Sequence, residues 1–152
     1  MGMEIPALGH GTTVAGDLFI KTWTTSGEQL FLDKEANVDF HIMGTGFTWD
    51  TQDKEKDIAA AKSLWQKAKK MLSDEQVGMV VLDEMTYMLN YNYLEHDDVL
   101  KAITGRPEHQ HVVITGRAAD EQLLEIADTV SEIKDIKHAF RQGVKAMPGT
   151  EW

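Results

Sequence analysis

Three apolar runs and one alternating segment predict four strands. The runs are residues 18–20, 80–82 and 112–114, and each is continuously apolar, as a strand covered on both faces is. Residues 38–42 alternate apolar and polar side chains instead, which is the period of a strand with one buried face. The chain is therefore expected to contain a sheet built from these four segments.

Helical periodicity lies between the predicted strands. Steps of three and four residues predict an amphipathic helix with Ile58, Ala61, Trp65, Ala68 and Leu72 on its apolar face. Residues 97–103 predict a second helix. Asp120 is placed to cap a third helix, which would carry Leu123, Leu124, Ala127 and Val130. This alternation predicts an α/β domain with a mostly parallel sheet flanked by helices, in which ligands bind at the carboxyl ends of the strands.

The composition adds an acidic surface to this picture. The 152 residues, 42% of them hydrophobic, are expected to form one domain over residues 1–152. The formal net charge of −10 argues against a nucleic-acid partner, which needs a basic face. No apolar run is long enough to span a bilayer, so no membrane partner is expected. The sequence has no cysteine, which excludes thiolate sites and fits a reducing cytoplasm.

Two carboxylates follow the predicted strand at residues 80–82. Asp83 and Glu84 would lie at the carboxyl edge of the sheet, where nucleotide-binding α/β proteins hold Mg²⁺ beside phosphates. The chemical reason is that Mg²⁺ prefers hard oxygen ligands. Many strands end in acids, however, and solvated acids in a turn or a helix cap are an equally good interpretation of this pattern.

A second candidate follows the predicted strand at residues 112–114. Thr115-Gly116-Arg117 would lie at the same edge of the sheet, and the planar guanidinium of Arg117 could neutralise phosphate oxygens. Taken alone, the segment is also compatible with a surface turn and a solvent-facing arginine.

Two large aromatic residues stand in a glycine-bearing loop. Phe47 and Trp49 follow the predicted strand at residues 38–42, within the segment 44–50. Loops are normally polar, so these side chains need an apolar partner. They either fold back on the core or form an apolar lid over a flat ligand.

No phosphate-binding loop of the Gly-x-x-x-x-Gly-Lys-Ser/Thr type occurs in residues 1–152, because the sequence has no Gly-Lys pair. The glycine-rich segment 9–13 has no lysine and no predicted strand before it, so it is not interpreted as such a loop.

Several motifs, in this order, resemble those of the ATP:corrinoid adenosyltransferases of the cobalamin pathway. The residues that carry the resemblance are Gly44-Thr45-Gly46-Phe47-Thr48-Trp49, Val81-Leu82-Asp83-Glu84-Met85-Thr86-Tyr87-Met88 with Tyr91 and Tyr93-Leu94, Arg106-Pro107, Val113-Ile114-Thr115-Gly116-Arg117, Ala127-Asp128-Thr129-Val130-Ser131-Glu132, and Lys137-His138-Ala139-Phe140 with Gly143-Val144-Lys145-Ala146. The similarity runs from about Ala7 to the C-terminus.

The resemblance implies a transferase that moves the 5′-deoxyadenosyl group of ATP to cobalt(I) of a corrinoid. It also implies that Glu84, with Asp83, holds Mg²⁺ in a Walker B position, and that Arg117 lies near the phosphates of ATP. Phe47 and Trp49 would exclude the lower axial ligand of cobalt, which makes cobalt(II) easier to reduce. A flavin-dependent reductase as partner and a homodimer are implied as well.

The chain departs from the family at its start. Family members begin with a strand, a phosphate loop and a helix, and the resemblance starts after all three, so the expected fold is P-loop nucleotidase-like without this first unit. Weak ATP binding is expected, and a non-catalytic corrinoid-binding protein is the alternative function. The missing strand is expected beside the strand at residues 80–82, and its loss leaves three outcomes: the segment near Leu8 to Ile20 shifts to fill the gap, a second chain covers it, or the domain is only partly ordered. The second outcome, a homodimer or larger oligomer with an interface near this strand, is the preferred expectation. Asp17 would be a costly carboxylate in an apolar strand.

Overall fold

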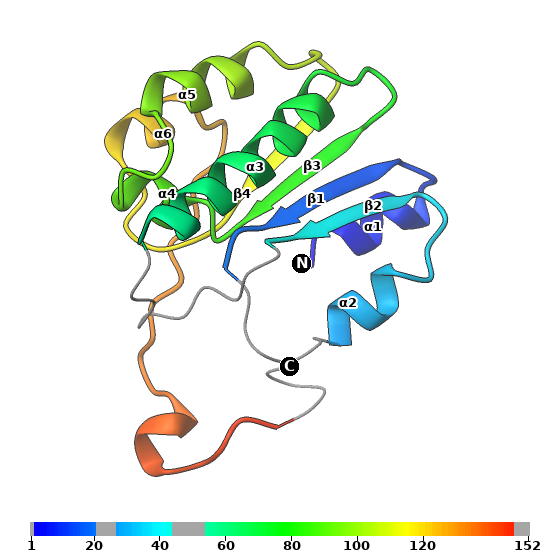
Figure 1. Ribbon diagram of the computed structural model, residues 1–152. Coiled ribbons are helices and arrows are strands. Elements are labelled where there is room, and N and C mark those ends of the chain that lie inside the picture. The colour runs from blue at the N-terminus through cyan, green and yellow to red at the C-terminus, as the bar shows by residue number, and fades with distance from the viewer. Residues whose placement is uncertain (1, 21–26, 44–53, 148–152) are drawn as a thin grey trace.

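A parallel four-stranded sheet forms the centre of the structure (Figure 1). The computed structural model describes residues 2–20, 27–43 and 54–147. The strands are β1 (Val14–Leu18), β2 (Val38–Ile42), β3 (Met79–Asp83) and β4 (His111–Ile114). Their order is β2-β1-β3-β4, and every neighbouring pair is parallel. The predicted parallel α/β architecture is therefore confirmed.

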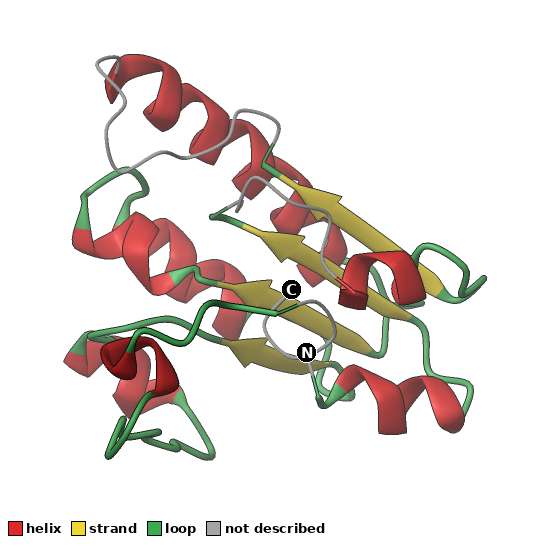
Figure 2. Ribbon diagram, turned by 90° about the horizontal axis from the view of Figure 1, so that it is seen from below, coloured by secondary structure: helices red, strands yellow, loops and turns green. Residues whose placement is uncertain are grey.

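Helices lie on both sides of this sheet. They are α1 (Glu4–Gly9), α2 (Gly27–Leu32), α3 (Lys54–Leu72), α4 (Thr86–Asn90), α5 (His96–Thr104) and α6 (Glu121–Ile126), followed by the 3-10 helix η1 (Ala139–Gln142). Helices α3 and α5 lie on one side of the sheet, and α1 and α2 lie on the other (Figures 1 and 2). No helix of the described residues is both long enough and apolar enough to cross a bilayer.

The larger core lies between α3 and the sheet. Four of the five apolar positions predicted for this helix are buried, namely Ala61, Trp65, Ala68 and Leu72, and Ile58 packs against them at the edge of the core. Val80 and Leu82 of β3 face them and are fully buried. The helical period thus correctly identified the face that covers the sheet.

The first strand lies earlier than predicted. Strand β1 spans Val14–Leu18, whereas the apolar pattern placed the strand at residues 18–20. Gly16 and Asp17 interrupt the apolar pattern of β1, so the sequence did not predict a strand at these residues. Glycine gives room at position 16, since a Cβ there would lie 3.0 Å from the ring of Phe40 on β2 and 3.2 Å from the carbonyl oxygen of Val81 on β3, and these neighbours would have to shift by a few tenths of an ångström.

The expected gap beside β3 does not exist. Strand β3 pairs with β1 on one side, from Val14↔Met79 onward, and with β4 on the other. The first of the three expected outcomes is the one found, because the segment near the N-terminus forms β1 and is the neighbour of β3. The preferred expectation, that a second chain would cover β3, was wrong. In the described sheet the edge strands are β2 and β4.

The last predicted helix begins as expected and ends early. Asp120 caps α6, since its Oδ1 accepts a hydrogen bond from the backbone N–H of Leu123 at 2.8 Å. The helix stops at Ile126, so the prediction that it would continue through Ala127 and Val130 was wrong. Residues 127–147, here called the C-terminal tail, contain only η1 as a regular element.

Asp17 is the last residue but one of β1 and is completely buried. Neither of its carboxylate oxygens has a hydrogen-bond partner among the described residues. Burial raises the pKa of this carboxyl group from 3.8 to about 7; the charge of Lys67 on α3 lowers it, and that of Asp39 on β2 raises it further. The expectation that this carboxylate lies buried in a strand is confirmed; its cost to stability stays a prediction.

Candidate functional site

The carboxyl ends of β3 and β4 lie side by side. Leu82 is paired with Ile114, so the next residues, Asp83 and Thr115, are also neighbours. The Thr115 hydroxyl donates a hydrogen bond to Oδ1 of Asp83 at 2.5 Å, and it accepts one from the backbone N–H of Glu84 at 3.0 Å. The side chain of Thr115, directly after β4, thus holds both Asp83 at the end of β3 and the backbone of Glu84 after it.

Glu84 is held in an unusual backbone conformation. Its φ of 58° lies in the left-handed region, which is uncommon for a residue with a side chain. Burial raises the pKa of its carboxyl group, the nearby charge of Asp83 raises it further, and the charge of Arg117 lowers it. Oε2 of Glu84 is buried and has no hydrogen-bond partner among the described residues. Such a strained and incompletely satisfied acid is typical of functional sites.

The segment after β4 is tied to helix α4. The hydroxyl of Thr86 and the side-chain amide of Asn90 donate hydrogen bonds to the backbone carbonyl of Arg117, at 2.8 and 3.0 Å. Gly116 has a φ of 141°, and a Cβ at this position would lie 1.9 Å from Oγ1 of Thr86. Only glycine therefore allows the two segments to approach so closely.

Arg117 lies at the same edge with an exposed side chain. Its charge acts on Glu84, as the direction of its effect on the pKa of that group shows. The structure thus brings together Asp83, Glu84 and Arg117, the three residues that the sequence placed at one edge of the sheet. The glycine-rich segment 9–13 instead leads into the amino end of β1, which is the opposite edge.

The donor set fits one Mg²⁺ ion that is shared with a phosphate ligand. Mg²⁺ is usually held by one or two carboxylates together with substrate phosphates and water. Asp83 and Glu84 provide two carboxylates, and the buried Oε2 of Glu84 lacks a partner that a cation would provide. No cluster of three or more metal-binding side chains occurs among the described residues, so an all-protein metal cage is not formed there.

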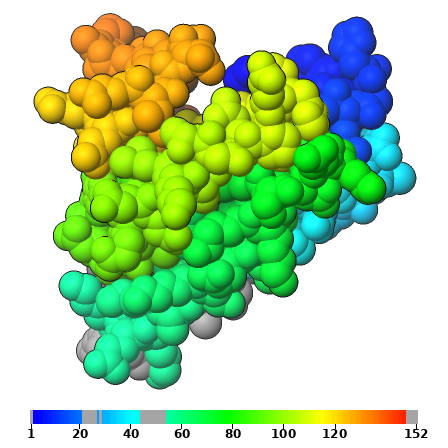
Figure 3. Space-filling view, turned by 90° about the horizontal axis from the view of Figure 1, so that it is seen from above, coloured from blue at the N-terminus to red at the C-terminus, as the bar shows by residue number. Residues whose placement is uncertain are grey.

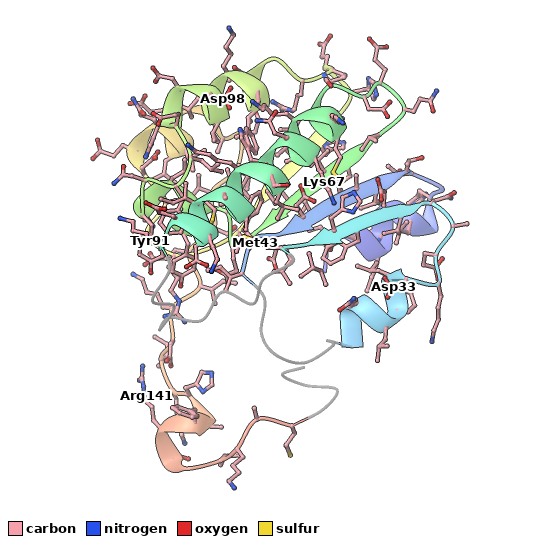
Figure 4. The ribbon with its side chains drawn as sticks, in the orientation of Figure 1. Asp33, Met43, Lys67, Tyr91, Asp98 and Arg141 are labelled. Carbon is pink, nitrogen blue, oxygen red and sulfur yellow. The ribbon has the colours of Figure 1, made fainter. Side chains whose placement is uncertain are left out.

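The aromatic candidates Phe47 and Trp49 lie outside the described residues. The described chain reaches Met43, which is buried directly after β2. Figure 4 shows Met43 and Tyr91 toward the end of the sheet at which the strands finish. Met43, the last described residue before this segment, therefore lies at the same edge as the carboxylates.

Three tyrosines form an aromatic cluster after β3. The ring centroids of Tyr87 and Tyr91 are 6.0 Å apart, and those of Tyr91 and Tyr93 are 5.7 Å apart. These separations are in the range of favourable aromatic pairs. Tyr91 and Tyr93 belong to the motif that carries the family resemblance, but the sequence assigned them no separate role.

Sequence reasoning also missed the residues that hold the site in place. Thr115, Thr86 and Asn90 were recognised at most as parts of motifs, because a hydroxyl or amide that bonds to a neighbouring segment leaves no periodic signal. The available signal was positional. Thr115 directly follows an apolar run, just as Asp83 closes another, so parallel pairing brings them together.

A parallel α/β sheet with two acids and an arginine at its carboxyl edge is typical of nucleotide-binding α/β proteins. Comparison with known sequences identifies one family within this class. Residues 1–152 match the protein family described as ATP:corrinoid adenosyltransferase BtuR/CobO/CobP. The chain belongs to this family.

Individual relatives agree with this assignment. A corrinoid adenosyltransferase of Escherichia coli (strain K12) is 48% identical over 151 residues, which cover 99% of this chain and 76% of the relative. One from Pseudomonas aeruginosa is 48% identical over 152 residues, covering 99% and 75% of the two chains. One from Sinorhizobium sp is 41% identical over 154 residues, covering 99% and 72%. About a quarter of each relative thus has no counterpart in residues 1–152.

Proposed function

We propose that this chain takes part in the transfer of the 5′-deoxyadenosyl group from ATP to cobalt(I) of a corrinoid. Two findings support the proposal: membership of the ATP:corrinoid adenosyltransferase family, and a carboxylate pair with an arginine at the ligand-binding edge of the sheet. The relatives are named as corrinoid adenosyltransferases, and the motifs at this edge are those that resemble the family.

The reaction balances without a protein base. The electron pair of cobalt(I) attacks C5′ of ATP and forms the cobalt–carbon bond. The bond from C5′ to the triphosphate oxygen breaks, and its electron pair leaves with triphosphate. Cobalt(I) must first be formed from cobalt(II) by one electron, for which a flavin-dependent reductase is the proposed donor. The protein then has to orient the two substrates and stabilise the charge of the leaving group.

Glu84 and Asp83 are the residues that would hold Mg²⁺. The ion, when bound, would neutralise part of the triphosphate charge. Thr115 keeps Asp83 and the backbone of Glu84 in position through its two hydrogen bonds. Arg117, exposed beside them, would bind phosphate oxygens through its guanidinium group.

The corrinoid side of the site is assigned to Phe47 and Trp49. We propose that these side chains pack under the corrin ring and exclude water and the lower axial ligand from cobalt. The proposal also includes a cytoplasmic location, which the absence of cysteine fits. It further includes a homodimer, for which the exposed Leu30 and Phe31 of α2 offer apolar surface.

The observation that carries the catalytic proposal is the hydrogen-bonded pair of Asp83 and Thr115 beside the incompletely satisfied Glu84. Chemically reduced corrinoid, Mg²⁺ and ATP are mixed with the protein, and light-sensitive adenosylcorrinoid and triphosphate are measured together. Glu84→Gln should lower formation of both products by at least about tenfold. Glu121→Gln, an exposed acid at the start of α6, is the matched control and should leave the rate unchanged. Equal rates for the two variants would contradict the assigned role.

A second function is favoured by one sequence observation. No Gly-Lys pair occurs in residues 1–152, so these residues alone are expected to bind ATP no more tightly than about millimolar. A protein that binds a corrinoid without transferring adenosyl is then the alternative. Calorimetry with Mg-ATP separates the two functions: a micromolar dissociation constant supports transfer, whereas corrinoid binding without measurable ATP binding supports the alternative.

The corrinoid site has its own test. Electron paramagnetic resonance of cob(II)alamin reports axial ligation directly. Phe47→Ala and Trp49→Ala should each weaken corrinoid binding or abolish the four-coordinate signal while the protein stays folded. If both variants unfold and the parent protein binds no corrinoid, the two aromatics are core residues and the proposed lid is wrong.

A further inference from the structure

Helix α4 is attached to Arg117, the residue to which the proposed function assigns the phosphates. The helix runs from Thr86 to Asn90 at the end of the sheet where the strands finish (Figure 1). Its first and last residues lie on the same side of the helix, because residues four positions apart are neighbours there. The hydroxyl of Thr86 and the side-chain amide of Asn90 both donate to the backbone carbonyl of Arg117, at 2.8 and 3.0 Å. Both lone pairs of this one oxygen are therefore occupied by α4.

The segment around Arg117 is strained on both sides of that residue. Gly116 before it has a φ of 141°, and Ala118 after it has a φ of 51°. The left-handed region is uncommon for alanine, and a residue stays there only when its surroundings hold it. The two hydrogen bonds from α4 act on the peptide group between Arg117 and Ala118, so they fix the segment at its strained point.

The side chain of Arg117 is exposed, and its guanidinium group forms no hydrogen bond or ion pair with another residue of the described chain. Its positive charge lowers the pKa of the Glu84 carboxyl group, so the guanidinium lies on the side of the carboxylates. The backbone of Arg117 is thus fixed by α4, while its guanidinium can bind an anion.

A ligand reaches this region from the carboxyl edge of the sheet. In the space-filling view, α3 (blue-green) and α5 (yellow-green) lie side by side over one face of the sheet, with the C-terminal tail (orange) beside them (Figure 3). Helices α1 and α2 lie over the other face (Figure 2). The edge where the strands finish is therefore the approach to Arg117, as is general in parallel α/β sheets.

We propose that Asn90 and Thr86 are positioning residues: they hold the backbone carbonyl of Arg117 so that its guanidinium group is directed at the phosphate oxygens. The inference rests on the proposed role of Arg117 and adds to it two side chains that act only through the backbone of that residue. Asn90 is the more informative of the two, because its side chain is exposed and its removal leaves the core intact. A carbonyl only accepts, so the amide nitrogen of Asn90 has to face it.

Binding of inorganic triphosphate with Mg²⁺, followed by phosphorus NMR, tests the proposal without corrinoid. Arg117→Ala should weaken binding by at least about tenfold, because a charged donor is lost. Asn90→Ala and Thr86→Val should each weaken it by about three- to tenfold, since each removes one of the two hydrogen bonds. Thr86→Ser keeps the hydroxyl and should stay within about twofold of the parent protein. Gln76→Ala, at an exposed amide before β3, is the control and should also stay within about twofold.

A double-mutant cycle separates positioning from stability. In an Arg117→Ala background, Asn90→Ala should change triphosphate binding by less than about twofold, because the group that it positions is gone. The backbone carbonyl remains in this background, so the fall in melting temperature caused by Asn90→Ala should be the same in both backgrounds. A residue that only stabilises the fold would instead lower binding by the same factor with and without the arginine side chain.

Three results would overturn the proposal. The first is an unchanged affinity for triphosphate in Asn90→Ala and Thr86→Val. The second is an equal loss of affinity in the two backgrounds of the cycle. The third is the absence of triphosphate binding by the parent protein at millimolar concentration, because Arg117 would then have no phosphate to bind. A parent protein that shows the expected pattern of binding but forms no adenosylcorrinoid would support the proposal and contradict only the proposed function.

Discussion

Strands β1 and β3 are neighbours in the sheet, and both carry carboxylates near the same end, yet their environments are opposite. Asp17 of β1 is paired in register with Leu82, one position before Asp83 of β3. Asp83 lies at the strand end and accepts a hydrogen bond from Thr115. Asp17 is fully buried, and neither of its oxygens has a hydrogen-bond partner among the described residues.

Asp17 lies one residue before the position paired with Asp83, and this offset explains the different environments. Side chains alternate between the two faces of a strand, so Asp17 points toward α3 and its apolar side chains, while Asp83 reaches the edge where the loops begin. The two acids differ in that a polar side chain directly after the neighbouring strand partners Asp83, whereas no described residue hydrogen-bonds to the carboxylate of Asp17. Without such a partner, a buried carboxylate is expected to destabilise the fold.

The largest effect on the free energy of unfolding is therefore expected at Asp17, whose carboxylate has no hydrogen-bond partner among the described residues. Asp17→Val should stabilise the protein at pH 8 by about 2–4 kcal/mol, because the pKa of this carboxyl group is raised from 3.8 to about 7. The penalty is absent below pH 3.8, where the group is protonated in both the folded and the unfolded chain. It grows as pH rises from 3.8 to about 7, since only the unfolded chain then loses its proton, and it is constant above that range.

Chemical denaturation of both proteins at pH 5 and pH 8 measures this effect. The difference in the free energy of unfolding between Asp17→Val and the parent should be smaller at pH 5 than at pH 8. Asp33→Asn, an exposed acid after α2, is the control and should show no such dependence. A variant that is destabilised at both pH values would mean that Asp17 has a stabilising partner.

The next largest effect is expected at Gly116, where the segment after β4 lies against Thr86, close to Asp83 and Glu84. Gly116→Ala should destabilise the protein by about 2–3 kcal/mol, because its Cβ would lie 1.9 Å from Oγ1 of Thr86 and its φ of 141° is strained for alanine. Gly143→Ala is the matched control. Gly143 has a φ of 78° with no atom near its Cβ position, so only backbone strain of about 1 kcal/mol is expected there. Thermal unfolding measures the stability of both variants. Equal losses of stability would show that Thr86 moves aside to make room for the Cβ at position 116.

Removing the Thr115 hydroxyl, which links Asp83 to the backbone of Glu84, should lower the free energy of unfolding by less than Gly116→Ala does. Thr115→Val keeps the shape of the side chain but loses the hydrogen bonds to Asp83 and to the N–H of Glu84, so a loss of about 1–2 kcal/mol is expected. Thr115→Ser retains the hydroxyl and should recover most of the loss. Denaturant unfolding gives the stability, and the affinity for Mn²⁺, measured by electron paramagnetic resonance, should fall for Thr115→Val alone. If serine does not recover that affinity, the hydroxyl has no positioning role.

The smallest effect is expected for an acid that is partnered but largely exposed. Asp98 of α5 accepts hydrogen bonds from Nε1 of Trp65 at 2.7 Å and from Nζ of Lys69 at 2.9 Å, and these partners lower its pKa. Because solvent screens the pair, Asp98→Asn should destabilise the protein by less than about 1 kcal/mol. The loss should be present at pH 7 and should vanish as the pH falls below the ordinary range of aspartate. Unfolding in urea at pH 7 and pH 3 measures it, and a loss that persists at pH 3 would point to packing instead.

The sequence was sufficient where a segment had a strong pattern of its own. Strands β3 and β4 were found as apolar runs, and α3 was found by its period. The placement of Asp83, Glu84 and Arg117 at one edge then followed from parallel pairing. These features depend on local chemistry and on one general rule of α/β sheets.

Features that arise from contacts between segments were not visible in the sequence. Strand β1 contains Gly16 and Asp17, and only its position between Phe40 and Val81 explains why it is a strand. Helix α6 stops at Ile126 although its apolar pattern continues. The role of Thr115 depends on a partner 32 positions away in the sequence. Phe47 and Trp49, the corrinoid candidates, remain predictions.

The strand order also determines how the chain can fold as it leaves the ribosome. Strands β1 and β2 emerge early and pair with each other, but the other neighbour of β1 is β3, which is synthesised only after the whole of α3. A pair of parallel strands without its covering helix is unstable in water. Strand β1 therefore gains its second neighbour only after residue 83 has been synthesised, and until then its apolar side chains stay uncovered by β3 and α3.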